Sequence, residues 1–162
     1  MDPKTSASEL LRSTWGDRGF PVDPVWIAGQ LGLEVREAVL PPNVSGALIK
    51  DRDQDPLIVL SQSDSKSRKR FTCAHELGHY ADRLGKDIEQ YEYIDLRGDQ
   101  SSTGTNPDEV FANQFAAALL MPEEEVRRLA KAKLPAFLMA QHFGVSDDAI
   151  RYRLRNLRLK VD

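Results

Sequence analysis

The chain has 162 residues, of which 41% are hydrophobic and 29% are charged. This balance is typical of a folded domain of ordinary size, so the composition excludes a disordered tract and a scaffold held together by disulfides. The net charge of −3 gives no global electrostatic reason to expect a nucleic acid or an anionic membrane as partner.

Two short helices are predicted at the start of the chain. Ser6 or Ser8 is expected to cap a helix that runs to about Trp15. Asp23-Pro24 resembles an N-cap followed by a proline in the first turn, and the apolar stripe that follows predicts a second helix up to Gly32.

Three strands are predicted next. Residues 33–39 alternate in polarity with the period of two that is typical of a half-buried strand. Residues 46–50 and 57–60 are short apolar runs on either side of a charged turn, which predicts an antiparallel hairpin. We therefore expect a small antiparallel sheet, and we expect one strand of the hairpin to form the edge of a substrate cleft.

The pattern becomes helical over residues 66–84, where apolar residues cover much of the helix circumference. A helix of this kind is normally central and buried. The polar residues inside it, His75, Glu76 and His79, therefore need partners or a cleft.

The second half of the chain is predicted to be helical after a long connection. Residues 85–107 are polar and longer than a compact domain usually spends on a loop, so we expect mobility there. Four helices should follow, at about residues 108–121, 123–132, from Pro135, and 147–158. The last two, joined by a turn at Gly144, have a helix-turn-helix-like cadence.

We expect one α+β domain, with the sheet packed on a helical core. Its parts are N-terminal helices and sheet (residues 1–64), the helices of the candidate metal site (65–132) and C-terminal, helix-turn-helix-like helices (133–162). Residues 1–20 contain no secretory signal, no stretch approaches eighteen apolar residues, and the one cysteine suits a reducing compartment. A cytoplasmic protein without a membrane partner is expected.

The sequence His75-Glu76-Leu77-Gly78-His79 has the spacing H-E-x-x-H. On a helix, residues four apart lie on one face, so both imidazoles can reach a single metal ion. Glu76 lies about 100° around the helix, where it suits a general base better than a ligand. The alternative, that these are ordinary core or cleft histidines, is disfavoured because motif and helical context coincide.

A catalytic zinc site needs a third protein ligand. Asp82 and Gly85 stand where the extended H-E-x-x-H-x-x-G-x-x-H pattern has its glycine and third histidine, so the ligand must come from elsewhere. We favour Glu109, which shares a helix face with the small or polar residues Ala112, Asn113 and Ala116. Asn113 could orient it.

Four other kinds of residue are candidates for roles at or near the same site. Asp108 is the rival ligand, although its position also suits an acid in the first turn of a helix. His142 and Cys73 are expected to have structural roles. Oxyanion stabilisation has three candidates that could equally be packing aromatics, namely Tyr80, Tyr91 and Tyr93.

Two segments carry a family resemblance. Residues 70–79 read RFTCAHELGH and residues 109–122 read EVFANQFAAALLMP. With these motifs the chain resembles the ImmA/IrrE family of metallopeptidases over nearly its whole length. The resemblance implies a gluzincin-like (zincin-type) fold with H-E-x-x-H on the central helix. Three residues match the family's metal positions, namely His75, His79 and Glu109, and Glu76 matches its catalytic glutamate.

The resemblance also implies a substrate class. Family members typically cleave helix-turn-helix transcriptional repressors and so release genes of mobile elements, prophages or stress responses. We therefore predict an endopeptidase that uses one Zn²⁺, although manganese or iron would also suit two histidines and one carboxylate.

Two other functions remain open from the sequence. One is a non-catalytic anti-repressor or antitoxin-like module, which the intact motif argues against. The other is DNA binding through residues 138–157. Residues 146–162 carry five bases and three acids, a net charge of +2, which is too small a footprint to make direct nucleic-acid binding the favoured function.

Overall fold

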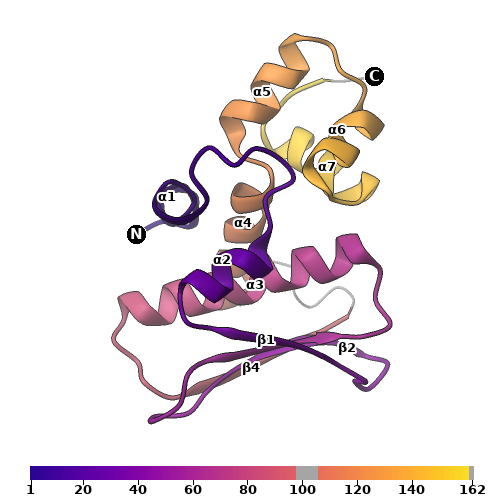
Figure 1. The fold of residues 1–162 in the computed structure, drawn as a ribbon. Coiled ribbons are helices and arrows are strands. Elements are labelled where there is room, and N and C mark those ends of the chain that lie inside the picture. The colour runs from indigo at the N-terminus through magenta and orange to yellow at the C-terminus, as the bar shows by residue number, and fades with distance from the viewer. Residues whose placement is uncertain (98–105, 161–162) are drawn as a thin grey trace.

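A computed structural model describes residues 1–97 and 106–160 of the chain (Figure 1). The fold is α+β. The helices are α1 (Pro3–Leu10), α2 (Pro24–Gln30), α3 (Lys66–Gly85), α4 (Pro107–Leu120), α5 (Glu123–Lys131), α6 (Ala136–Phe143) and α7 (Asp147–Asn156), and a π-helical segment η1 (Leu11–Trp15) continues α1. The strands are β1 (Glu34–Ala38), β2 (Val44–Lys50), β3 (Leu57–Ser61) and β4 (Tyr91–Leu96).

The sheet has the order β1-β3-β2-β4 and is mixed. The predicted hairpin is confirmed, because β2 and β3 pair antiparallel with Leu48 opposite Ile58. The prediction of a purely antiparallel sheet is wrong, because β1 pairs with β3 in parallel, with Val35 opposite Ile58. Alternating polarity identifies a strand but carries no information on which neighbour it pairs with or in which direction.

Strand β4 was not predicted. It lies inside the segment that the sequence suggested was a polar connection, and it pairs antiparallel with β2. Tyr91, Tyr93 and Ile94 are residues that favour strands, so a signal was present, but the charged residues between them concealed it. The expectation of mobility falls partly on residues 98–105, which lie outside the described residues.

The edges of the sheet are β1 and β4, while β2 and β3 are interior. The prediction that residues 46–50 or 57–60 form the edge of a cleft is therefore wrong. An interior strand already has both rows of backbone groups paired, so only β1 and β4 offer free groups among the described strands.

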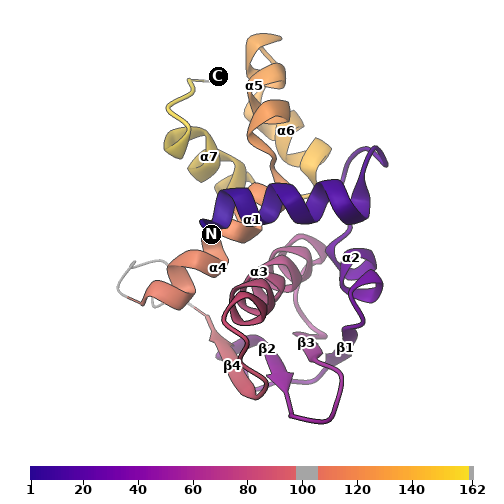
Figure 2. The same ribbon diagram turned by 90° about the vertical axis from the view of Figure 1, so that its left-hand side faces the viewer.

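The helices cover one face of the sheet in successive layers. Figure 1 shows α2 and α3 against the sheet, and Figure 2 shows α1 and α4 next to α3 with α5, α6 and α7 beyond them. The core between these layers is apolar, and its largest fully buried side chains include Ile27, Leu48, Ile58, Leu77, Phe115, Leu119, Met139 and Phe143. None of the helices in the described part of the chain is long and apolar enough to cross a membrane.

Helix starts follow local capping chemistry. Asp2, not Ser6 or Ser8, caps α1, because its carboxylate accepts a hydrogen bond from the Thr5 amide and Pro3 occupies the first turn. The predicted start at Asp23 is confirmed for α2 by the same arrangement. Ser65 caps α3 by accepting from the Arg68 amide at 3.2 Å.

Arg70 joins the central helix to distant parts of the chain. Its guanidinium donates to the carbonyls of Gly144 (3.0 Å) and Phe143 (3.3 Å), at the end of α6, and to the carbonyl of Val22, just before α2. The first residue of the RFTCAHELGH segment therefore fixes how the C-terminal helices sit on α3.

Candidate metal centre

His75 and His79 of α3 and Glu109 of α4 come together in the structure. One ligand atom from each lies within 4.8 Å of the others, and this is a group that could hold a metal ion. His75 Nε2 is 2.9 Å from Glu109 Oε2, and His79 Nε2 is 3.3 Å from Glu109 Oε1. The two histidine side chains are 2% and 1% exposed, so the site is closed to bulk water on the side of α3.

Close helix packing brings Glu109 to the histidines. A Cβ atom added at Gly78 would lie 2.9 Å from Ala112 Cα and 3.1 Å from Phe115 Cβ, so only glycine allows this separation of α3 and α4. Ala112 is fully buried at the contact. Since Glu109 lies about one turn before Ala112, the contact sets its distance from the two imidazoles.

Each histidine contacts Glu109 at ion-pair distance, but neither contact is a well-formed hydrogen bond. His75 Nε2, His79 Nε2 and Glu109 Oε2 are all buried without a hydrogen-bond partner among the described residues. Buried polar atoms of this kind are costly unless something else binds them. Two imidazole nitrogens and one carboxylate oxygen are also a common ligand set of catalytic zinc, so the residues present fit a metal ion.

Asn113 holds the first histidine from the other side. Its Oδ1 atom lies 2.8 Å from His75 Nδ1 and, as an acceptor, favours a proton on Nδ1, so that in neutral His75 the lone pair is on Nε2. Asn113 lies one turn after Glu109 on α4. One helix therefore supplies both a candidate ligand and the group that orients another.

Glu76 lies beside this cluster with no exposed surface. Neither of its carboxylate oxygens has a hydrogen-bond partner among the described residues. Burial raises the pKa of Glu76 well above its usual range, and the positive charge of His75 only partly opposes this effect. A carboxylate in this condition is poised to accept a proton.

A third carboxylate, Asp95 of β4, also faces the site. It is 6% exposed, and its Oδ1 atom is 3.8 Å from His75 Nε2. Burial raises the pKa of Asp95 above its usual range. Three carboxylates gathered in a buried space repel one another, and a divalent cation between them would offset that repulsion.

The charges of the candidate ligands themselves are shifted in opposite directions. Burial acts to lower the pKa of His75, but its contact with Glu109 and the nearby carboxylates outweigh burial and raise that pKa to about 9. Burial lowers the pKa of His79. Burial of Glu109 opposes its ionisation, yet the two imidazoles hold its pKa well below the usual range. These shifts favour a protonated His75 beside an ionised Glu109.

The rival ligand Asp108 points elsewhere. Its carboxylate pairs with the Arg83 guanidinium and accepts a hydrogen bond from the Tyr93 hydroxyl at 3.2 Å. The interpretation of Asp108 as an acid in the first turn of a helix is confirmed, with Asn106 as the N-cap.

Tyr93 is the candidate tyrosine that contacts a metal-site residue. Its ring stacks on His79 with centroids 3.8 Å apart and planes 9° apart. Its hydroxyl is held by Arg83 and Asp108, and burial raises its pKa to about 12. In this arrangement Tyr93 supports the His79 ring, and its hydroxyl is engaged away from it.

The remaining candidates lie outside the cluster. Tyr91 is near Tyr93, with ring centroids 6.0 Å apart, and Tyr80 is half-buried.

Cys73 is fully buried, and burial raises its thiol pKa far above the usual range. His142 contacts Glu125 at 2.7 Å and packs against Phe20, which is the structural role expected from the sequence.

Sequence reasoning missed Asp95 and Arg83. Asp95 was overlooked because strand β4 was overlooked. The alternation of Tyr91, Tyr93 and Asp95 along one face of β4 was the available signal. Nothing in the sequence pointed to Arg83, whose role depends on where β4 and α4 come to lie.

Fold and site define a small α+β protein with a two-histidine, one-glutamate candidate metal centre. The chain belongs to the Peptidase M78 family, described as IrrE N-terminal-like domain, which matches residues 28–155. This confirms the resemblance to ImmA/IrrE metallopeptidases, and the family points to a zinc-dependent peptidase.

Comparison with solved structures shows a similar fold in a Mycobacterium tuberculosis transcriptional regulator. The TM-score is 0.63 at 16% sequence identity, and the match covers 94% of this chain. The chain spans 46% of that protein's length. Comparison with curated proteins found no match.

Proposed function

We propose that the protein is a cytoplasmic, zinc-dependent endopeptidase that cleaves a helix-turn-helix transcriptional repressor. The observation that carries the proposal is Glu76. It is fully buried next to the cluster of His75, His79 and Glu109, and both of its carboxylate oxygens lack a partner among the described residues. A structural carboxylate would be paired, whereas a general base must be free to take a proton.

The roles of the residues follow from their positions. His75, His79 and Glu109 would hold the zinc, which supplies a Lewis acid for the peptide carbonyl and increases the acidity of water. Glu76 takes the proton of the attacking water and returns it to the leaving amine. Asn113 keeps His75 in the tautomer that can bind metal, and the ring of Tyr93 fixes the orientation of His79.

Strand β4 is the best placed element to hold an extended substrate. It is an edge strand, and two of its side chains, Tyr93 and Asp95, contact metal-site histidines. A substrate segment that added as a further strand on β4 would pass beside the site. Strand β4 therefore takes the role of substrate-binding edge that the sequence analysis assigned to the hairpin strands.

Two findings support a repressor as substrate. The chain belongs to a family whose members, by the resemblance stated above, typically act on such proteins. A solved structure with a similar fold is, by its name, a transcriptional regulator. The proposed consequence of cleavage is relief of repression of a mobile element, prophage or stress regulon.

The test is cleavage of purified helix-turn-helix repressors by the zinc-loaded protein, beginning with any that a neighbouring gene encodes. Glu76→Gln should lower the cleavage rate by about 10²–10⁴-fold, because the amide keeps the shape but cannot accept the proton. Zinc content and thermal unfolding should be unchanged. Glu89→Gln, at an exposed position, is the matched control and should cleave normally.

The same assay separates this function from a non-catalytic anti-repressor. A docking module would bind the repressor equally well in both forms and cleave it in neither. Comparable cleavage by Glu76→Gln and the unaltered protein would instead show that Glu76 is not the base.

A further inference from the structure

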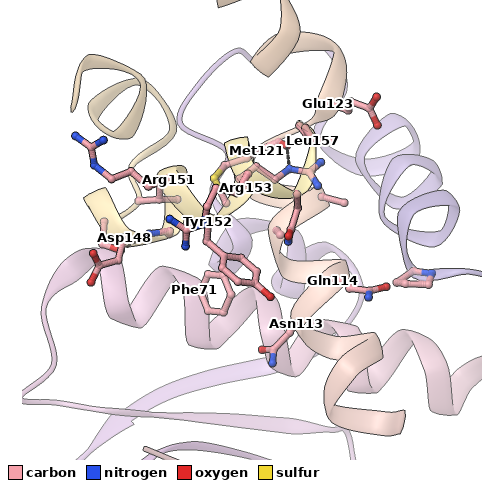
Figure 3. A pocket seen from close by; sticks show the side chains of 18 of the residues that line it. Phe71, Asn113, Gln114, Met121, Glu123, Asp148, Arg151, Tyr152, Arg153 and Leu157 are labelled. Atoms are coloured by element: carbon pink, nitrogen blue, oxygen red, sulfur yellow. Dashed lines mark hydrogen bonds between the residues drawn. The ribbon is translucent and has the colours of Figure 1, made fainter. Parts of the chain in front are cut away.

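A groove of about 1300 Å³ separates α7 from α3 and α4 (Figure 3). One continuous face of α4 forms its floor, with the helical spacing i, i+3, i+4, i+7, i+8, i+11. The residues of that face are Val110, Asn113, Gln114, Ala117 and Ala118 of α4 and its C-cap residue Met121. Phe71 of α3 adds an aromatic ring to the floor.

The opposite wall of the groove is cationic and aromatic. Arg151, Tyr152 and Arg155 of α7 line it and are exposed, and Tyr152 is 57% exposed. In Figure 3, Tyr152 points from α7 toward Phe71 and Asn113. Tyrosine and arginine beside an apolar floor form the composition that is enriched at the centres of protein interfaces.

The two arginines are not neutralised within the described part of the chain. Neither Arg151 nor Arg155 forms an ion pair there, and Arg155 lies 5.7 Å from the Tyr152 ring centroid. Of the three acids that line the groove among the described residues, one is unpaired, and it offsets at most one of the two positive charges. Glu123 pairs with Lys4 and Arg127, and Asp2 caps α1, which leaves Asp148 as the unpaired acid on the α7 wall.

The groove continues from the candidate metal centre along two helices. Asn113 lines the groove and also bonds to His75. Phe71 precedes His75 by one turn of α3, and Glu109 precedes Asn113 by one turn of α4. From Glu109 to Met121 is about 18 Å along the helix, which an extended chain covers in about six residues.

We propose that this groove is a docking site for a segment of the protein substrate that carries an apolar side chain and acidic residues, within about six residues of the cleaved bond. The apolar side chain packs on Phe71 and Val110, and the acidic residues pair with Arg151 and Arg155. The identity of the occupant as a substrate segment rests on the proposed function. The position and chemistry of the groove are independent of that function.

The same geometry disfavours DNA as the occupant. A helix-turn-helix protein needs the face of its second helix free to enter the major groove. Here the corresponding helix, α7, turns Tyr152 toward α3 and α4 (Figure 3). Its first turn also carries Asp147 and Asp148, which would repel phosphate.

Binding can be tested without cleavage, in zinc-loaded Glu76→Gln protein. The protein is used to select from a phage-displayed library of random 12-residue peptides, and the selected peptides are synthesised with a fluorescein label for polarisation measurements. We expect the selected peptides to be enriched in Asp and Glu together with an apolar residue. Their affinity should fall at least tenfold in Arg151→Gln/Arg155→Gln and in Tyr152→Ala. Arg12→Gln, an exposed arginine on η1, is the matched control and should bind normally.

Zinc content and thermal unfolding are measured for each variant, so that a folding defect is not mistaken for lost binding. The proposal is overturned if no peptide is selected, or if the double arginine variant binds the selected peptides as well as the control. It is also overturned if the double arginine variant loses binding to mixed-sequence duplex DNA but keeps binding to peptide. Peptide binding at the groove without any repressor cleavage by the unaltered protein would leave the docking site standing and refute the proposed function. Cleavage that is lost in Glu76→Gln but unaffected by the groove variants would support the proposed function and refute the docking site.

Discussion

Histidine side chains contact glutamate in two regions of this molecule, and the two contacts differ in burial and in hydrogen bonding. Among the C-terminal helices, His142 contacts Glu125 at 2.7 Å, and Glu125 also bonds to Arg128. Between α3 and α4, His75 and His79 share Glu109 and leave buried atoms without hydrogen bonds. The first pair is 31% and 14% exposed, whereas the two histidines of the second are almost fully buried.

The difference indicates what distinguishes a candidate functional cluster from a structural one. A partly exposed pair with a further partner is satisfied and costs little. A buried group of two imidazoles and several carboxylates without full pairing is costly for the folded protein, so a ligand that completes it must compensate. The candidate site is marked by buried polar atoms that lack hydrogen-bond partners, more than by the contact between histidine and glutamate.

The largest expected effect is the loss of zinc binding when a residue of the buried cluster, but not of the exposed pair, is removed. His79→Ala or Glu109→Ala should weaken zinc binding by about 3 kcal/mol or more, since one of three ligands is lost from a total of about 10–16 kcal/mol. His142→Ala and Glu125→Ala, which remove the equivalent pair elsewhere, should bind zinc normally. Chelator competition and elemental analysis measure both. Equal retention in Glu109→Ala and the unaltered protein would remove Glu109 from the ligand set, and Asp108→Ala should not affect retention.

Helix packing at Gly78 is expected to have the next largest effect. Gly78→Ala should destabilise the protein by about 1–3 kcal/mol, because the added methyl group meets the α4 backbone. Gly29→Ala is the control, since a Cβ there has no neighbour within 4 Å, and it should be neutral or slightly stabilising. Chemical denaturation measures the difference. A Gly78→Ala protein of full stability would mean that α3 and α4 can separate without penalty.

Asn113 should matter for metal affinity more than for folding. Asn113→Ala removes the group that orients His75 and should weaken zinc binding about 10–100-fold. Gln114→Ala, at the next position, is the control and should leave zinc affinity unchanged. If the two variants bind zinc equally, His75 does not need this support.

The smallest effect, counted per pH unit, concerns the protonation of His75. Because the pKa of His75 without metal is raised to about 9, zinc must displace its proton at neutral pH. Zinc affinity should therefore rise about tenfold per pH unit up to about pH 9 and level off above it. His79, whose pKa is lowered, is already neutral and adds nothing to this slope. Calorimetry in buffers of different ionisation enthalpy would count the released protons, and zinc affinity that is independent of pH between 7 and 9 would refute the assigned charge of His75.

Much of the helical part of this protein could be predicted from its sequence. The segments of α2, α3 and α4 were predicted to within one or two residues, because proline, capping residues and apolar periodicity are local signals. The spacing of His75 and His79 also follows from one helix alone. The choice of Glu109 over Asp108 depended on helix faces, and the resemblance of two segments to a known family agreed with it.

Only the tertiary structure decided the rest. The parallel pairing of β1 with β3, the existence of β4 as an edge and the position of Asp95 depend on which segments meet in space, and a period of two in the sequence does not encode this. The support of His79 by Tyr93, Arg83 and Asp108 joins three elements that are separated along the chain. The sequence determined which residues could bind a metal and act as a base, since that depends on residue type and local spacing. Whether these atoms are buried, unsatisfied and next to a groove depends on long-range packing, which no single segment contains.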